Sequence, residues 1–405
     1  MRKLAMSPIY AMGQKNKKKE EDIYEVKSIG LITPLDDGSS NDNTGKTQKG
    51  MIDGKSYTFR VSEYVGKRPK ILGKINWELT YHNLDDGEWK TIPMPTKGET
   101  FILNIGGETC GRYIYIRAYI NDKKNSAVLK IWKHNRFRWF DRKLFEEQLE
   151  DRIISPWEIY QAGTSLCGMA CIFYLFAKEY PKAYKKFCKD LFRKGTATYN
   201  QYTAKPSKEI LDKKTVKKKS NGKEVMLPEG NTGLSLVDFV TLAGIRNSEF
   251  PLYKGGDEDL LAINWTNIMI KLCEKLLGYK TVKSNNAYNP IKYSEFDVIK
   301  LKDIIKDINK QIEDGFKLIL LVDSDLIKYD EDNILNLFEW EYHWVVLESP
   351  IEEIQNLNAN GEIFPTFDFR VYSWGSNPFG KYRFLRKPIT AGHFIKNYYG
   401  YIKMK

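Results

Sequence analysis

The spacing of apolar residues changes along this chain and divides it into two parts. In the first part, residues 24–132, short runs of alternating apolar and polar residues are separated by turn residues such as Asp-Gly and Gly-Gly. About seven such strands in about a hundred residues are typical of a β-sandwich. The clearest runs are 24–32, 56–63, 73–81, 99–105, 112–120 and 126–132.

In the second part the apolar residues recur at helical spacing instead. Leu144, Phe145 and Leu149 fall on one face of the segment 141–150, which predicts a connecting helix packed against one or both neighbouring regions. The run 317–322 is continuously apolar and predicts a strand in a central position. Further helices are predicted at 168–178, 181–193, 234–243, 264–277 and 302–313.

Two segments of the second part are interpreted as loops. The stretch 205–223 is rich in lysine, including Lys213, Lys214 and Lys217, and is predicted to be a solvated insertion loop. Residues 351–366 show no pattern that favours one structure. We expect the specificity of any activity to depend on these two segments.

The chain has five cysteines, an odd number, and they are scattered along it. No disulfide framework is implied, so we expect the protein to fold in a reducing cytoplasm. Cys167 and Cys171 would share a helix face, but no second Cys or His pair stands at metal-ligand spacing. We therefore expect no metal site and interpret Cys171 as a core residue. The others are Cys110, Cys188 and Cys273.

The amino-terminal end and the net charge argue against several classes of protein. The first residues are basic and partly apolar, but Ser7 and Pro8 interrupt them, so they make a poor signal peptide. No apolar run approaches the roughly 18 residues of a membrane span. The net charge is +12, but the lysine clusters at 15–19 and 213–219 lack a recognition helix or an aromatic platform. Nucleic acid is therefore not expected as the substrate, whereas a polyanionic cell-envelope target would suit the charge.

One octapeptide, Gln161-Ala-Gly-Thr-Ser-Leu-Cys167-Gly168, carries the strongest chemical signal. Cys167 opens a strongly apolar helix, so its thiol would lie at the positive end of the helix dipole, which favours the thiolate. Gln161 could direct its side-chain NH₂ to the same point. The two would supply the nucleophile and the oxyanion donor of acyl transfer. The alternative is that Cys167 is a core residue, because free cysteines are commonly buried.

Only one of the four histidines falls in a segment that resembles a core strand. His343 lies in the run 341–347, and the next strand-like run is 367–375. A nucleophile on an early helix, a base on a later strand and an orienting group on the following strand is the arrangement of a cysteine triad. The alternative is a hydrogen-bonded core histidine. The other histidines, at a turn, a strand exit and a helix start, are His82, His134 and His393.

These residues resemble the papain superfamily, in which a Gln six residues before the Cys completes the oxyanion hole. Ser373-Trp374-Gly375 resembles the Asn-Ser-Trp-Gly stretch of that superfamily. The chain also resembles a narrower bacterial group, the papain-like domains of type VI secretion effectors and related polymorphic toxins. The resemblance covers about residues 155–405. The four motifs shared with that group stand in order at 164–168, 343–347, 373–375 and 397–401.

The resemblance implies roles for named side chains. Cys167 would be the nucleophile and His343 the general base, while Gln161 and the Cys167 backbone N–H would hold the oxyanion. The third member of the triad departs from the family, because Tyr372 stands where papain has its orienting Asn. We favour Ser373, whose hydroxyl could accept a hydrogen bond from the His343 ring. No cofactor is implied.

Other side chains near Ser373 could take the orienting role. Tyr372 could do so through its phenol, and Asn377 and Asp368 are nearby. Strand alternation puts Tyr372 and Ser373 on opposite faces, so at most one of them faces the site. Trp374 is expected either to shield the histidine contact or to be an ordinary core residue.

The first part of the chain resembles an immunoglobulin-like (Ig-like) sandwich. Trp77 stands where such a sandwich keeps its buried tryptophan. Tyr113 resembles the tyrosine of a tyrosine corner, although Ile114 and its alternating neighbours could equally form the inward face. No cysteine pair bridges the predicted sheets. The expected role is docking, and the alternative is a passive spacer.

The 405 residues are enough for two domains. We predict a multidomain chain with a flexible basic N-terminus at 1–22, an all-β Ig-like sandwich at 23–136, a connecting helix at 137–154 and an α+β papain-like domain at 155–405. The expected function is hydrolysis of a protein or peptidoglycan amide by an antibacterial toxin, exported from the cytoplasm of its producer without a classical signal peptide. The expected partners are a cognate immunity protein and a secretion-apparatus component, with no stable membrane insertion. The alternatives are a non-toxic processing protease and a catalytically silent binding or assembly protein.

Overall fold

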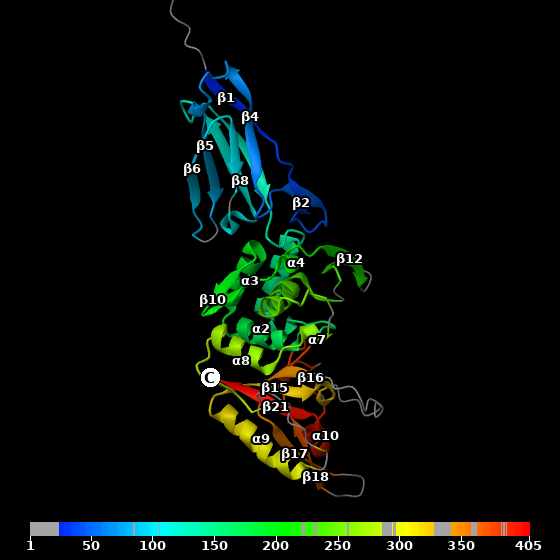
Figure 1. The fold of residues 1–405 in the computed structure, drawn as a ribbon. Helices are drawn as coiled ribbons and strands as arrows, with labels where there is room; N and C mark the ends of the chain where they lie inside the picture. The colour runs from blue at the N-terminus through cyan, green and yellow to red at the C-terminus, as the bar shows by residue number, and fades with distance from the viewer. Residues whose placement is uncertain are drawn as a thin grey trace, which may run out of the picture.

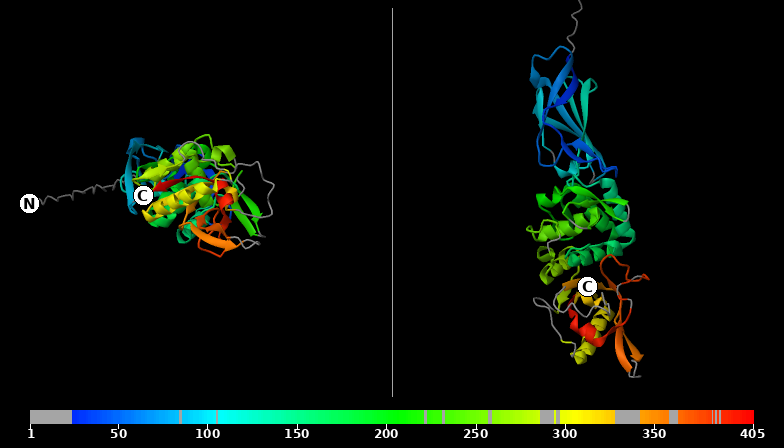
Figure 2. Two further views of the ribbon diagram at one scale, coloured as in Figure 1. Left: turned by 90° about the horizontal axis from the view of Figure 1, so that it is seen from below. Right: turned by 90° about the vertical axis from the view of Figure 1, so that its right-hand side faces the viewer.

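The computed structural model arranges the chain in three regions along one long axis (Figure 1). A β-rich region stands at one end, a helical layer in the middle, and a sheet with its own covering helices at the other end. A perpendicular view shows the same order (Figure 2). The flexible N-terminus predicted at 1–22 lies outside the described residues. The structure describes residues 24–405 except 84–85, 105, 221–222, 231–232, 257–258, 286–293, 295–296, 328–341, 358–362, 382, 384 and 386.

Strands β1 to β9 make up the β-rich region and confirm the prediction of a β-rich first part. Seven of them form a three-stranded sheet of order β1-β4-β7 and a four-stranded sheet of order β6-β5-β8-β9. The remaining two, β2 and β3, pair as a hairpin. The strands are β1 (Tyr24–Leu31), β2 (Asp36–Ser39), β3 (Thr47–Gly50), β4 (Tyr57–Gly66), β5 (Asn76–His82), β6 (Trp89–Lys97), β7 (Thr100–Leu103), β8 (Arg112–Tyr119) and β9 (Ser126–Lys133).

One apolar core fills the space between these two sheets. Trp77 of β5 stacks on Phe101 of β7 with ring centroids 5.3 Å apart, so this contact joins one sheet to the other. Trp77 is 1% exposed, and its indole N–H donates to the Gly98 carbonyl at 2.8 Å. The predicted burial of Trp77 is therefore confirmed. Burying a side chain of this kind stabilises the fold by about 2 to 3 kcal/mol.

Two details of the β-rich region differ from the sequence-based interpretation. The tyrosine-corner interpretation of Tyr113 is wrong, because Tyr113 is 43% exposed and packs edge-on against Trp132. The alternative is confirmed, since Ile114 is fully buried. Strand β6 was not predicted because it carries two prolines and is mostly exposed. An edge strand tolerates both features, and β6 lies at the edge of its sheet.

Helix α2 (Cys167–Glu179) lies at the centre of the helical layer. Every residue from Cys167 to Ala177 is buried, as expected for a helix that is apolar on all sides. The predicted helices of this layer are confirmed, although α5 and α6 are joined by a π-helical turn. The helices around α2 are α1 (Arg142–Ile154), α3 (Pro181–Lys194), α4 (Lys208–Leu211), α5 (Leu236–Asp238), the π turn (Phe239–Ala243), α6 (Gly244–Glu249), α7 (Asp259–Ala262) and α8 (Thr266–Lys275).

Helix α1 joins the β-rich region to the helical layer. The Asp141 side chain caps α1 by accepting from a backbone N–H of its first turn at 3.1 Å. The same carboxylate accepts from Ser39 Oγ at 3.3 Å and from the Asn43 backbone N–H at 2.8 Å, in and next to the β2–β3 hairpin. Phe145 stacks on Phe192 of α3 with centroids 4.2 Å apart. The predicted connecting helix therefore packs in the helical layer and is held to the hairpin by its cap.

The solvated loop predicted at 205–223 is wrong, because its first half contains the helix α4, with Ile210 and Leu211 buried, and its second half contains a strand. Strands β12 (Thr215–Ser220) and β13 (Lys223–Pro228) form an antiparallel hairpin in which Val216 pairs with Leu227. Strand β12 has three lysines and a single apolar residue, Val216, so its composition does not indicate a strand, but the Asn-Gly pair between the two strands is a strong hairpin signal in the sequence. A second, smaller hairpin in this layer consists of β10 (Ala197–Tyr199) and β11 (Tyr202–Ala204).

The third region is built on a five-stranded antiparallel sheet of order β14-β21-β15-β16-β19. The central position predicted for 317–322 is confirmed, because β15 is the third of the five strands. Ile319 and Leu321 face the helical layer, whereas Leu318 and Leu320 face the opposite side. Burial of both faces explains a continuous apolar run in an antiparallel sheet. The strands are β14 (Val282–Ser284), β15 (Lys317–Asp323), β16 (Tyr342–Leu347), β19 (Val371–Tyr372) and β21 (Tyr398–Met404).

Two helices and a small sheet cover the outer face of this five-stranded sheet. The interpretation of 351–366 as a loop is wrong, because this segment contributes two strands of the small sheet, whose order is β17-β18-β20. None of the described helices is long and apolar enough to cross a membrane. The elements of this cover are α9 (Val298–Glu313), α10 (Ala391–Lys396), β17 (Glu352–Leu357), β18 (Ile363–Asp368) and β20 (Ile389–Thr390).

Candidate active site

Cys167 is the first residue of α2, and α2 packs against β16. One turn further along the helix, Cys171 Sγ donates to the Trp344 carbonyl at 3.3 Å. The backbone N–H of Trp344 is in turn hydrogen-bonded to the Cys167 sulfur. The start of α2 therefore lies over the part of β16 that carries His343, the residue before Trp344.

Burial raises the pKa of the Cys167 thiol to about 11, because apolar surroundings disfavour the charged thiolate. The backbone N–H groups of Trp344, Gly168 and Cys167 itself act in the opposite direction. The expectation of a thiolate at the helix N-terminus is therefore wrong for the site at rest. The effect of burial outweighs that of these backbone N–H groups, so the sulfur needs a proton acceptor to become a nucleophile.

His343 contacts two residues of the loop that follows β19. Its Nε2 lies 2.6 Å from Ser373 Oγ, and its ring stacks on Trp374 with centroids 4.0 Å apart and planes inclined by 14°. The imidazole is 4% exposed. When Nε2 donates to the hydroxyl, Nδ1 on the other edge of the ring carries a lone pair and can accept a proton.

The other candidates for the orienting role are occupied elsewhere. Tyr372 points to the opposite face of β19, where its hydroxyl donates to the Ile159 carbonyl at 2.6 Å. Asp368 accepts from the Arg383 guanidinium at 3.0 and 2.9 Å. Asn377 uses its side-chain oxygen to accept a backbone N–H of its own turn at 2.9 Å. Among the four candidates, Ser373 is the one placed against His343.

No family model, no curated protein and no solved structure matches this chain. The chemistry of the site has to be inferred from its own geometry. That geometry combines a thiol at a helix start with an imidazole on the strand below it and a hydroxyl on the imidazole. Proton transfer and nucleophilic attack use groups of these kinds, and the described contacts join His343 to Ser373 and Trp374 and place Cys167 beside Trp344.

Gln161 lies in the loop before α2 and is buried. Its side-chain Nε2 donates to the Thr164 backbone carbonyl at 2.8 Å, and the backbone carbonyl of Gln161 accepts from Thr164 Oγ1 at 2.6 Å. An amide NH₂ has two hydrogens, so one N–H of Gln161 is left for another acceptor. Its role at the oxyanion stays a prediction. The residue after it, Ala162, has a φ of 53°, a strained value for alanine.

The Gln161 loop touches the loop that carries Ser373. Gly375 has a φ of 69°, and a Cβ built on it would lie 3.2 Å from the Cβ of Tyr160. Trp374, which stacks on His343, also has a positive φ of 42°. Glycine is therefore needed where the two loops meet. The contact brings the predicted oxyanion donor to the loop that orients the base.

A buried ion pair that the sequence analysis missed supports the Gln161 loop. Arg152 of α1 donates to Asp238 at 2.8 Å, and Asp238 accepts from the Tyr160 backbone N–H at 3.4 Å. Asp238 also accepts from Ser235 Oγ at 2.8 Å. Ser235 caps its helix and Asp238 stands three residues later, which is the capping-box spacing that could have identified Asp238.

The other histidines have contacts outside the site. His82 packs edge-on against Trp89, and His134 Nδ1 accepts from an indole N–H at 3.1 Å. His393 Nε2 lies 3.0 Å from the Asp325 carbonyl. Within the described part of the chain, no group of three or more His, Cys, Asp or Glu side chains is placed to hold a metal ion.

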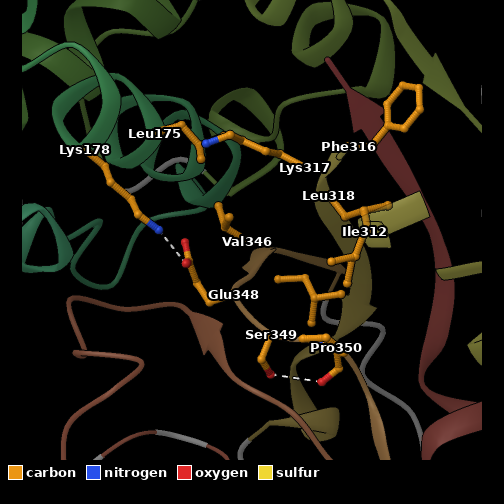
Figure 3. Close-up of a pocket in the computed structure, with 11 residues that line it drawn as sticks. Leu175, Lys178, Ile312, Phe316, Lys317, Leu318, Val346, Glu348, Ser349 and Pro350 are labelled. Atoms are coloured by element: carbon orange, nitrogen blue, oxygen red, sulfur yellow. Dashed lines mark hydrogen bonds and ion pairs between the residues drawn. The ribbon is translucent and has the colours of Figure 1, made fainter. Parts of the chain in front are cut away.

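A cavity of about 140 Å³ lies at the opposite end of α2 (Figure 3). Lys178 and Glu348 form an ion pair on its wall. Because a helix rises about 1.5 Å per residue, Lys178 lies about 16 Å along α2 from Cys167. The cavity is therefore separate from the Cys167 site.

Proposed function

We propose that this protein is a cysteine-dependent amide hydrolase whose second part is a papain-like catalytic domain. The observation that carries the proposal is the His343–Ser373 contact of 2.6 Å under the Trp374 ring, next to the helix that begins at Cys167. Four sequence motifs in the order of papain-like toxin domains support it. The helices-first, sheet-last order of the second part is consistent with such a domain.

The proposed reaction begins with a neutral thiol. Because burial raises the pKa of Cys167 to about 11, the proton leaves for His343 Nδ1 as the sulfur approaches the amide carbon. Ser373 keeps Nε2 hydrogen-bonded and so stabilises the imidazolium that forms. Three backbone N–H groups stabilise the charge on the sulfur during the transfer.

The following steps are those of acyl transfer. A C–S bond forms, and the carbonyl electrons move to oxygen, where the Cys167 backbone N–H and the remaining N–H of Gln161 stabilise the negative charge. Collapse of this intermediate breaks the C–N bond, and the amine leaves with the proton from His343. Water that gives its proton to His343 then cleaves the thioester, which releases the acid and restores the thiol.

The test compares the full chain with Cys167→Ala on two substrates. Purified peptidoglycan and a bacterial proteome are incubated with each protein, and new amine or carboxylate ends are detected by mass spectrometry. We expect products from the wild type alone, in one of the two substrates. Products from both proteins, or from neither, would count against the thiol mechanism.

The β-rich region supports the proposal of an Ig-like docking domain. Without the β2–β3 hairpin, the seven remaining strands split into sheets of three and four, and Trp77 lies buried on the third of them, as in Ig-like sandwiches. Asp141 fixes the β2–β3 hairpin to α1, and this attachment between the two regions favours a docking role over a passive spacer. Deleting this region should leave hydrolysis of a small substrate intact and reduce delivery.

The proposed biological role is that of an antibacterial effector delivered by a contact-dependent secretion system, with an immunity protein in the producer. The motif order supports this role. Expression in the cytoplasm and, separately, in the periplasm of a susceptible cell tests it. We expect killing in one compartment by the wild type and none by Cys167→Ala. Equal toxicity of both proteins would contradict it, and activity on a defined peptide without killing would favour a processing protease.

The alternative of a catalytically silent binding protein predicts a different thiol chemistry. In a working site, Cys167 should react with iodoacetamide faster than Cys171 and Cys188, because His343 can take its proton. Peptide mapping after alkylation near neutral pH measures the three rates. Equally slow reaction of all three thiols would favour the silent protein.

A further inference from the structure

Asn264 is a buried polar residue beside Cys167 whose side chain lacks a partner among the residues that the structure describes. It is 1% exposed, and neither Oδ1 nor Nδ2 has a hydrogen bond there. A Cβ built on Gly168 would lie 2.9 Å from Asn264 Nδ2. The amide therefore lies against the first turn of α2, next to the residue that bears the thiol.

The surrounding residues fix the position of Asn264. The indole N–H of Trp344 donates to the Asn264 backbone carbonyl at 2.9 Å, and Trp344 directly follows His343. A side chain at position 168 would collide with Asn264 and with Met269 Sδ, which lies 2.6 Å from the same Cβ position. Glycine at 168 therefore leaves room for the amide, whose place is set by the packing around it.

An amide buried without hydrogen bonds opposes folding, so its retention beside a reactive thiol calls for a compensating partner. We propose that Asn264 binds an amide group of the substrate, with Nδ2 donating to its carbonyl and Oδ1 accepting from its N–H. This inference rests on the proposed function. A peptide bond or a carboxamide satisfies both atoms of Asn264, whereas an ester leaves Oδ1 without a donor.

Two exposed aromatic residues adjoin the proposed contacts in sequence. Trp265 follows Asn264 and is 58% exposed, and Tyr160 precedes Gln161 and is also exposed. Aromatic rings next to a few fixed polar groups are typical of ligand-binding surfaces. Trp265 and Tyr160 would provide apolar contacts to a substrate whose amide group binds Asn264.

The test uses two thiol reagents on the full chain. Iodoacetamide carries a carboxamide, whereas methyl methanethiosulfonate has none, so the ratio of their rates at Cys167 reports recognition of an amide. Asn264→Leu keeps the approximate shape and removes both hydrogen-bonding atoms. We expect the rate ratio to fall about threefold to tenfold, the size of one or two neutral hydrogen bonds, with an unchanged rate for methyl methanethiosulfonate.

A matched control separates binding from folding. Asn247 is also buried, but its amide donates to the Tyr253 carbonyl at 2.6 Å and accepts from the Ser207 backbone N–H at 2.6 Å. Asn247→Leu should lower the melting temperature and leave the rate ratio of its folded fraction unchanged. Asn264→Leu should keep or raise the melting temperature, because it removes unsatisfied polar atoms.

Each outcome decides the question. An unchanged rate ratio, an equal fall in both rates, or a loss of stability in both Asn264→Leu and Asn264→Ala would overturn the binding role. If wild-type Cys167 reacts no faster than Cys171 with either reagent, the thiol mechanism itself fails. That result differs from the failure of Asn264 alone, in which wild-type Cys167 stays the fastest thiol.

Discussion

The β-rich region and the region of the candidate site place strained backbone in different kinds of residue. In the described β-rich region, the non-glycine residues with positive φ are Asn41 and Asn43, a type that tolerates this conformation. The region of the candidate site has Asn200 at a turn, but also Ala162 and Trp374, which tolerate it poorly. Ala162 follows the predicted oxyanion donor, and Trp374 stacks on the predicted base. Strain of this kind collects where function requires a fixed geometry.

Buried polar groups show the same contrast. In the β-rich region, the buried carboxylate of Glu78 is paired with Lys123 and with Arg117, so it is satisfied on both sides. Beside Cys167, the Asn264 amide has no partner among the described residues. Glu78 is therefore fully paired, whereas the amide of Asn264, unpaired in the described part of the chain, lowers stability and is available to the proposed substrate. Mutations in the β-rich region should therefore change the free energy of unfolding, whereas mutations in the candidate site should change activity.

The largest expected effect follows from removing the base. His343→Ala should lower the rate of amide hydrolysis by at least about 10³-fold, because the neutral thiol loses its proton acceptor. The free energy of unfolding should change much less, and denaturant unfolding with steady-state kinetics measures both. A loss of activity that only matches a loss of folded protein would contradict the assignment.

The same variant has a distinct pH dependence. Without His343, Cys167 has to ionise alone, and its pKa is raised to about 11. Below that pKa the thiolate fraction rises with pH, so alkylation of Cys167 in His343→Ala should speed up about tenfold per pH unit between pH 8 and 10. The wild type should show a much flatter profile there. Alkylation rates at fixed ionic strength measure this difference.

Trp77→Ala tests the same comparison by a change in the β-rich region. Removing a buried indole that packs on Phe101 between two sheets should cost about 3 to 5 kcal/mol of unfolding free energy in the β-rich region. Hydrolysis of a small substrate should stay within about twofold of the wild type, since no residue of the site belongs to that core. A parallel loss of activity would show that the two regions are coupled.

Local patterns account for what the sequence predicted. The apolar run after Cys167 predicts α2, and the run at 317–322 predicts a central strand, because both signals lie within one element. Alternation was enough to separate Tyr372 from Ser373, since neighbours on a strand face opposite sides. The order of motifs made Cys167 and His343 candidates, and their roles stay predictions.

Properties that depend on packing could not be predicted in the same way. The raised pKa of Cys167 results from burial by elements distant in sequence, which no helix-dipole argument includes. Asn264 has no motif around it, and it becomes a candidate only because Gly168 and Trp344 meet it in the fold. The β12–β13 hairpin was missed because the lysines of β12 indicated a solvated loop, although the Asn-Gly pair between the strands indicates a hairpin.

A smaller effect is expected from the residue that orients the base. Ser373→Ala should lower kcat by about tenfold to a hundredfold, because the imidazolium loses the hydrogen bond to Ser373 and His343 loses a contact that positions its ring. KM should change little. A kcat as high as that of the wild type would show that Trp374 alone positions the ring.

Tyr372→Phe is the matched partner of that variant and has the smallest expected effect on catalysis. The two residues are adjacent, but the Tyr372 hydroxyl donates to the Ile159 carbonyl, and its ring stacks on Tyr174 with centroids 3.8 Å apart. Phenylalanine keeps the stack and leaves a buried carbonyl unsatisfied, so unfolding should become easier by about 1 to 3 kcal/mol. The kcat should fall less than about threefold, since the backbone near Gln161 loses an anchor but His343 keeps Ser373. Chemical denaturation and kinetics on the two variants measure the contrast, and a kcat loss as large as that of Ser373→Ala would show that both faces of this strand serve the reaction.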